Sequence, residues 1–213
     1  GLLTASKFSF SGHYFEPYKN TFGEDGKANK GFLYTRLKVS DDCYISVINT
    51  HLQATSIYDT KSTLKIIYEK KIKKQKDNKL VNKEKSNVVK EKQMKELSEN
   101  IDRIKTNKLL KNDTVIVAGD FNSTAISKRL KLFNKTVQKM YNNLDSTINH
   151  EKLLTCCDDE FKIQYDHMFI FSNREKIPKI KFSTDSGGDD SCDNHDYCLS
   201  DHKPLNMNFV LKE

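Results

Sequence analysis

The stretch TVIVAGDFN (114–122) decides how this chain is expected to fold. Its first half, 114–118, is a short apolar run of the kind found in a central strand that is covered on both faces. Asp120 and Asn122 follow at once, so the strand would end with a carboxylate and an amide at the edge of a sheet. The stretch therefore predicts a core strand that carries polar groups to a rigid position, where functional residues often lie.

Helices on both sides of 114–118 are predicted to cover this strand. Before it, apolar residues recur at three- and four-residue steps through about Leu109, and after it a second helix is expected over about 126–140. The segment 56–92 is rich in Lys, Asn and Glu, which suits an exposed insertion or a solvated helix better than core. The apolar stripes consist of Met94, Leu97, Ile101 and Ile104 in the first helix and Leu130, Phe133 and Val137 in the second.

Further strands complete the predicted sheet. Alternating side chains indicate a hairpin of 31–39 with 43–50, and 165–171 and 205–211 have the pattern of later strands. A chain of 213 residues is expected to form one domain over its whole length, 1–213. Strands interleaved with helices predict a mixed domain of helices and sheet.

Charge and cysteine content narrow the function only slightly. A net charge of +7 favours polyanionic partners such as nucleic acid or anionic lipid, although solubility alone also accounts for it. No stretch approaches the roughly 20 apolar residues of a membrane-spanning helix. Five cysteines are not an evenly paired framework. Cys192, His195 and Cys198 match no common zinc spacing, so loop residues or one local disulfide is favoured there.

Polar residues of catalytic type stand at the ends of several predicted strands. Each has an ordinary structural interpretation when taken alone, because a histidine often ends a strand and an aspartate often begins a turn. Together they supply carboxylates, an amide and imidazoles, which suit hydrolysis of a phosphate ester assisted by a hard divalent cation. The groups are His51, Asp120 with Asn122, Asp166, and Asp201 with His202.

Six short motifs follow one another along nearly the whole chain. They are NKGFLYTRL (29–37), NTHLQA (49–54), KQMKEL (92–97), GDFNS (119–123), YDHMFIF (165–171) and SDHKPL (200–205). In this order they resemble the endonuclease/exonuclease/phosphatase superfamily of metal-dependent phosphodiesterases, and within it a neutral sphingomyelinase. The resemblance implies an α+β fold, a two-sheet β-sandwich flanked by helices in the four-layer, DNase I-like manner. It also implies Mg²⁺-dependent hydrolysis of sphingomyelin to ceramide and phosphocholine, with Mn²⁺ as an alternative cation.

The resemblance implies a role for each matching residue. His202 would be the general base, Asp166 would hold its ring in the right tautomer, and His51 would bind phosphoryl oxygens or assist the leaving group. Asp120 and Asn122 would orient water and phosphate or contact the cation. The implied substrate-binding residues are Lys30 and Asn49, and the implied cation ligands are Asp120, Asn122, Asp201 and His202.

Two of these motif positions have a competing interpretation. Lys30 is equally well explained as a solvated loop lysine. His167 stands where the superfamily often has Tyr, and it is not counted as catalytic. The superfamily's principal metal ligand is a Glu on a strand that would lie before Gly1. On the resemblance, the chain is therefore expected to be N-terminally incomplete and to bind Mg²⁺ weakly as it stands.

Other functions remain open at the level of sequence. They are a nuclease or deadenylase of the same superfamily, an inositol-phosphate 5-phosphatase, and a non-catalytic relative. The expected partner is phospholipid at a membrane surface, reached through a segment outside this sequence, with anionic lipid as a second partner of segment 56–92. Nucleic acid is less favoured, since this segment has few aromatic side chains on which bases could stack.

Overall fold

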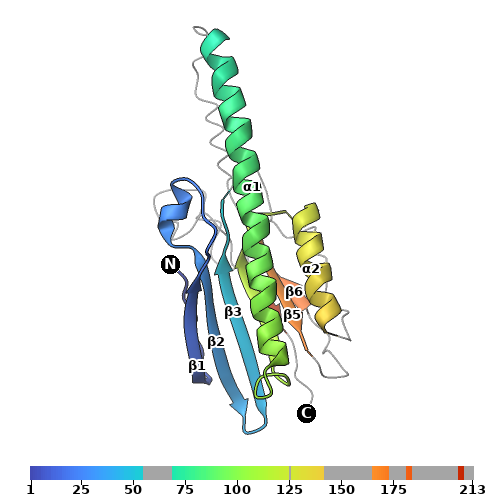
Figure 1. The fold of residues 1–213 in the computed structure, drawn as a ribbon. Coiled ribbons are helices and arrows are strands. Elements are labelled where there is room, and N and C mark those ends of the chain that lie inside the picture. The colour runs from blue at the N-terminus through green and yellow to red at the C-terminus, as the bar shows by residue number, and fades with distance from the viewer. Residues whose placement is uncertain (55–68, 125, 142–164, 173–180, 184–205, 209–213) are drawn as a thin grey trace.

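The computed structural model describes residues 1–54, 69–124, 126–141, 165–172, 181–183 and 206–208 (Figure 1). Two sheets and two α-helices are described, so the predicted α+β class is confirmed. The elements are β1 (Ser9–Pro17), η1 (Asp25–Ala28), β2 (Gly31–Ser40), β3 (Cys43–His51), α1 (Glu69–Thr106), β4 (Thr114–Asp120), α2 (Lys128–Met140), β5 (Asp166–Phe171), β6 (Lys181–Ser183) and β7 (Asn206–Asn208).

The larger sheet has the strand order β1-β2-β3-β4-β5, and β6 pairs with β7 in the smaller sheet. Strands β2 and β3 form the predicted antiparallel hairpin, and the chain then crosses through α1 to place β4 parallel to β3. Strand β5 runs antiparallel to β4. The run 114–118 is therefore a central strand between β3 and β5, as predicted. Residues 1–7 form no strand.

Both helices lie side by side over one face of the larger sheet (Figure 1). Their predicted apolar stripes are buried against strands β2 to β5 in one core. The first helix begins at Glu69 and ends at Thr106. It is longer than predicted, since the predicted apolar stripe starts only at Met94. Its first part extends beyond the end of the sheet (Figure 1). Residues 69–92 are thus continuous with the buried helix, whereas 56–68 lie outside the described residues.

Strand β4 is buried on both faces. Val115 and Val117 point into the core beneath the helices, whereas Ile116 packs on the opposite face. The opposite cluster consists of Leu37, Ile45, Ile116 and Ile170, with Phe8, Val39, Val47 and Met168 at its margin. Alternation along β4 then places Asp120 on the same face as Ile116.

Gly119 allows β3 and β4 to approach at the point where both strands end. A Cβ atom at this position would lie 1.9 Å from the carbonyl oxygen of Thr50, and the φ angle of Gly119 is +141°, which side chains rarely tolerate. Any other residue would force the two strands apart. The close approach keeps the register in which His51 lies opposite Asp120.

Removing a core side chain of α1 should test this packing. Leu97 is fully buried, so Leu97→Ala is expected to lower the free energy of unfolding by about 2–5 kcal/mol through lost burial and a residual cavity. Leu109 is the matched control, since its side chain is 79% exposed, and Leu109→Ala should have little effect. Urea unfolding followed by circular dichroism measures both. Equal losses for the two variants would contradict the placement of α1.

Candidate active site

Three of the predicted site residues lie in one row across neighbouring strands. His51 at the end of β3 pairs in register with Asp120 at the end of β4, and Asp120 pairs with Asp166 at the start of β5. Because side chains alternate along a strand, residues paired in register share a face. The structure therefore brings one imidazole and two carboxylates together at one edge of the sheet. Their chemical roles remain predictions.

The turn after β4 folds Asn122 back onto Asp120. The backbone N–H of Asn122 donates to Asp120 Oδ1 at 2.7 Å, and its side-chain amide donates to Asp120 Oδ2 at 3.2 Å. Asn122 has a φ angle of +46°, a left-handed conformation that asparagine adopts more readily than most residues. The same amide donates to the carbonyl oxygen of Leu52 at 3.0 Å. The GDFN motif thus orients one carboxylate through its own backbone.

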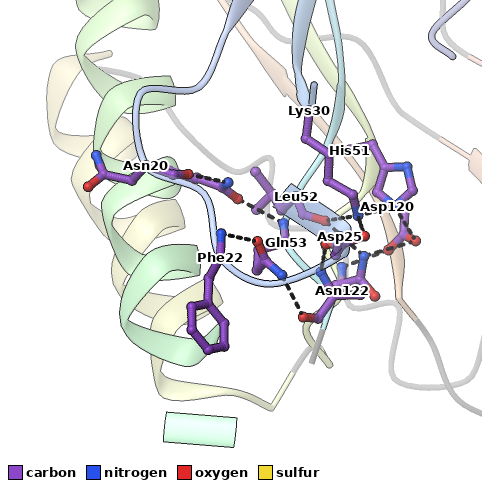
Figure 2. A network of polar contacts seen from close by, with 11 residues as sticks. Asn20, Phe22, Asp25, Lys30, His51, Leu52, Gln53, Asp120 and Asn122 are labelled. Atoms are coloured by element: carbon purple, nitrogen blue, oxygen red, sulfur yellow. Dashed lines mark hydrogen bonds and ion pairs between the residues drawn. The ribbon is translucent and has the colours of Figure 1, made fainter. Parts of the chain in front are cut away.

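Lys30 is buried beneath the site and is not a solvated loop lysine. Its side chain is 5% exposed. Its ammonium lies 2.9 Å from His51 Nε2, 2.8 Å from Asp25 Oδ1 and 2.8 Å from the carbonyl oxygen of Leu52 (Figure 2). Three acceptors match the three hydrogens of an ammonium group, so Lys30 joins three segments of the site.

The contacts of His51 fix a preferred tautomer. An ammonium group can only donate, so Nε2 of His51 accepts from Lys30, and the proton of the neutral ring is on Nδ1. Asp120 Oδ2 also lies 3.5 Å from Nε2, and this contact would require a proton on the same nitrogen. The two contacts compete, and the Lys30 contact at 2.9 Å prevails because it is shorter. The His51 side chain is 46% exposed and remains accessible to a ligand.

A second buried lysine reaches the site from α1. Lys90 is 2% exposed, and its ammonium donates to the carbonyl oxygen of Asn122. Burial lowers the pKa of Lys90 to about 8; the nearby Arg129 also lowers it, whereas Asp120 opposes the shift. Sequence reasoning missed this residue by treating 56–92 as solvated. A signal was present, since Lys90 precedes Met94 by one helical turn and continues the apolar stripe.

Asp25 is the other site residue that sequence reasoning missed. It lies in η1, before β2, where it pairs with Lys30 and accepts from the backbone N–H of Ala54 at 2.7 Å. Nothing in the local sequence distinguishes it from a turn-forming aspartate. Its position against Lys30 and Ala54 depends on the way three distant segments meet.

Four motif residues remain, and one of them, His167, is not counted as catalytic. Asn49 shares a strand face with His51, and its amide donates to the carbonyl oxygen of Leu3 at 2.9 Å. His167 points to the helix-covered side, where it is 2% exposed and lies 2.6 Å from the carbonyl oxygen of Ser123. Asp201 and His202 lie outside the described residues, as does the segment with Cys192 and Cys198.

Tyr165 adds an aromatic ring beside the row of site residues. Burial raises the pKa of its hydroxyl group, and the negative charge of Asp120 raises it further.

Within the part of the chain that the structure describes, no three His, Cys, Asp or Glu side chains gather closely enough to hold a metal ion. In the same part, no helix is both long and apolar enough to cross a membrane.

Comparison with known proteins identifies the fold. No protein-family model and no curated protein sequence matches the chain. Beta toxin from Staphylococcus aureus matches with a TM-score of 0.61 and 19% identity over 96% of this chain and 66% of that one. A variant of this toxin with bound magnesium ions gives a TM-score of 0.58 and 17% identity, again over 96% of this chain and 66% of that one.

Two further solved structures extend this likeness. Sphingomyelinase C from Streptomyces griseocarneus matches with a TM-score of 0.55 and 13% identity, over 85% of this chain and 56% of that one. Truncated Caenorhabditis elegans TDP2 matches with a TM-score of 0.51 and 14% identity, over 97% of this chain and 68% of that one. The predicted DNase I-like α+β fold is therefore confirmed. The chain spans less than two thirds of the length of this sphingomyelinase C.

The tautomer of His51 tests the arrangement around Lys30. In mildly alkaline solution the proton of the ring is expected on Nδ1, because Lys30 donates to Nε2. Lys30→Met removes that donor, so the proton should move to Nε2 and face Asp120 Oδ2. The ¹⁵N chemical shifts of the ring nitrogens distinguish the two tautomers. Lys27→Met is the control, since Lys27 is exposed and pairs with Glu24. A proton on Nε2 in the unmodified protein would refute the arrangement.

Proposed function

We propose that this chain carries a metal-assisted phosphodiesterase site, in which water attacks the phosphorus of a phosphodiester. The observation that carries the proposal is the register of His51, Asp120 and Asp166 at one edge of the sheet. Such a row offers carboxylates for a cation and an imidazole for a phosphoryl oxygen within one small region. The six motifs that follow this fold in order add support from the sequence.

Magnesium is the proposed cation, with manganese as an alternative. The Asp120 carboxylate and the Asn122 side-chain oxygen are hard donors of the type that Mg²⁺ prefers. Their donor chemistry fits the ion, and beta toxin is known with bound magnesium ions. Asp201 is proposed to add a further carboxylate to the donor set. A bound cation would neutralise phosphoryl charge during the attack of water.

The proposed proton transfers involve two histidines. His51 would donate a hydrogen bond to a phosphoryl oxygen or to the leaving group, while Lys30 keeps its ring in place. His202 would take a proton from the attacking water, and Asp166 would hold the ring of His202 in its reactive tautomer. Asn49 would contact substrate on the same strand face as His51, two residues before it.

Sphingomyelin is the proposed substrate, cleaved to ceramide and phosphocholine. Support comes from the NKGFLYTRL and KQMKEL motifs, since the fold is common to sphingomyelinase C and to TDP2 and does not select a substrate. A nuclease or deadenylase is the second candidate, and the net charge of +7 favours it. A non-catalytic relative is the third.

Loss of activity in a site variant tests the reaction. In the full-length protein, Asp120→Asn is expected to lower turnover of sphingomyelin by about 10²–10⁴-fold, because it removes a charged cation ligand. Asp41→Asn is the matched control, since Asp41 is 94% exposed on the β2–β3 turn. Turnover should also stop on removal of Mg²⁺ by a chelator and return when Mg²⁺ is added.

The substrate assay separates the candidates. Sphingomyelin in mixed micelles, a single-stranded oligonucleotide and an inositol polyphosphate are each offered with Mg²⁺. Cleavage of the oligonucleotide alone would replace the lipid substrate with nucleic acid. Cleavage of none of them, by a protein that binds no Mg²⁺, would favour the non-catalytic relative.

We further propose that anionic lipid contacts the exposed Lys83 and Lys85 of α1, in the part of the helix that extends beyond the sheet (Figure 1). Each basic residue near an anionic surface contributes about 1 kcal/mol to binding. Changing Lys83 and Lys85 to Glu together should weaken binding to phosphatidylserine-containing vesicles by on the order of tenfold or more. Lys135→Glu on α2 is the control. Cosedimentation with these vesicles and with pure phosphatidylcholine vesicles measures the effect, and unchanged binding would reject this surface.

A further inference from the structure

Helix α1 contacts the candidate site with a buried charge. Burying an ammonium group costs several kcal/mol unless hydrogen bonds and opposite charges compensate for it. Lys90 is 2% exposed, and an apolar side chain of similar length would pack at this position without that cost. The contact that the charge makes, with the carbonyl oxygen of Asn122, therefore needs an explanation beyond packing.

The carbonyl of Asn122 belongs to the turn that orients Asp120. On one side of this turn, the backbone N–H and the side-chain amide of Asn122 both donate to the Asp120 carboxylate. The carbonyl of the same residue is held by Lys90. The left-handed φ angle of +46° at Asn122 is less favourable than ordinary backbone, so the turn depends on contacts that keep it closed. Lys90 supplies one of these contacts from outside the turn.

Two more residues of α1 continue this contact along the same side of the helix. Gln93 accepts from the backbone N–H of Gln53 at 2.8 Å and donates to the carbonyl oxygen of Asn20 at 2.8 Å. Glu96 accepts from the Asn20 amide at 2.6 Å and from the backbone N–H of Lys19 at 3.0 Å. Figure 2 shows the segments with Asn20 and Gln53 beside the labelled site residues.

The hydrogen bonds of Lys90, Gln93 and Glu96 reach three segments, and each segment contains or adjoins a site residue. The segment with Asn20 leads to Asp25, the segment with Gln53 follows His51, and the Asn122 turn follows Asp120. Lys90 and Gln93, and likewise Gln93 and Glu96, are three positions apart and are therefore neighbours on the helix surface. A single rigid helix is therefore bonded to all three segments at once.

We propose that Lys90, Gln93 and Glu96 of α1 form a bracket that sets the spacing of the three site segments, with Lys90 as the positioning residue for Asp120 and Asn122. The proposal rests on the proposed function, because it assigns the bracket to a phosphodiesterase site. Lys90 acts through the backbone of Asn122 and contacts neither substrate nor cation. Residues that hold metal ligands in place typically affect metal affinity or activity by about 10–100-fold when changed.

The test compares Lys90 variants in the full-length protein. Lys90→Met should lower kcat and the affinity for Mn²⁺, followed by electron paramagnetic resonance, by about 10–100-fold each, while KM for the substrate stays nearly unchanged. Lys90→Arg retains a donor and a charge, so it should recover part of both losses. Lys95→Met is the matched control, since Lys95 is 79% exposed on the same helix, and it should behave like the unmodified protein.

A purely structural role predicts a different pattern. If Lys90→Met lowers only the free energy of unfolding and leaves kcat and Mn²⁺ affinity unchanged, the proposal is overturned. Should Lys90→Met fail to fold, Lys90→Leu replaces it, because this shorter apolar side chain also removes the donor to the Asn122 carbonyl. An unchanged Mn²⁺ affinity in that folded variant, together with an unchanged hydrogen-exchange rate at the backbone N–H of Asn122, would equally overturn it.

Failure of the proposed function can be recognised separately. If the unmodified protein hydrolyses no phosphodiester, the phosphodiesterase proposal fails. The bracket is still tested by the exchange rate of the Asn122 backbone N–H, which donates to Asp120. Faster exchange in Lys90→Met than in Lys95→Met supports a positioning role, whereas equal rates exclude it.

Discussion

The parallel pairing of β3 with β4 is the constraint on which the rest of the site depends. It holds His51 opposite Asp120, and the pairing of β4 with β5 then holds Asp120 opposite Asp166. Gly119 makes this possible, since a Cβ atom there would collide with the Thr50 carbonyl oxygen at 1.9 Å. Parallel strands need a long connection between them, and α1 provides it. The helix that carries Lys90 is therefore also the connection that allows β3 and β4 to pair in parallel.

The parts of the fold that sequence could predict are those fixed by local pattern. The apolar run 114–118 and the stripe of Leu97 and Ile101 were correctly assigned, because burial on one or both faces leaves a period in the sequence. The start of α1 was not correctly assigned, because a segment rich in Lys, Glu and Asn is equally compatible with a solvated helix and with a loop. Asp25 and Lys90 were missed because their roles arise only when segments far apart in the sequence meet.

Two buried ammonium groups, those of Lys30 and Lys90, belong to the candidate site. Lys30 is compensated by Asp25, by His51 and by a carbonyl oxygen, whereas Lys90 is compensated less completely, since burial and Arg129 lower its pKa and Asp120 only partly opposes them. The net charge of +7 says little about this arrangement, because most of those charges are solvated. Around the row, the ammonium groups of Lys30 and Lys90 are outnumbered by the carboxylates of Asp25, Asp120 and Asp166. The proposed cation would supply the positive charge that a phosphate group needs at this site.

The same scaffold can serve several substrates because it fixes the reacting groups and leaves the surrounding surface open to change. Lipid and nucleic acid both present a phosphodiester, so the row of His51, Asp120 and Asp166 cannot by itself distinguish them. Discrimination must come from what lies around that row. Among the described residues, the segment 18–30 and the first part of α1 flank it, and the bracket of hydrogen bonds from α1 connects the two. Under the proposed function, a ligand surface on α1 would be connected to the turn that holds Asp120 through these hydrogen bonds.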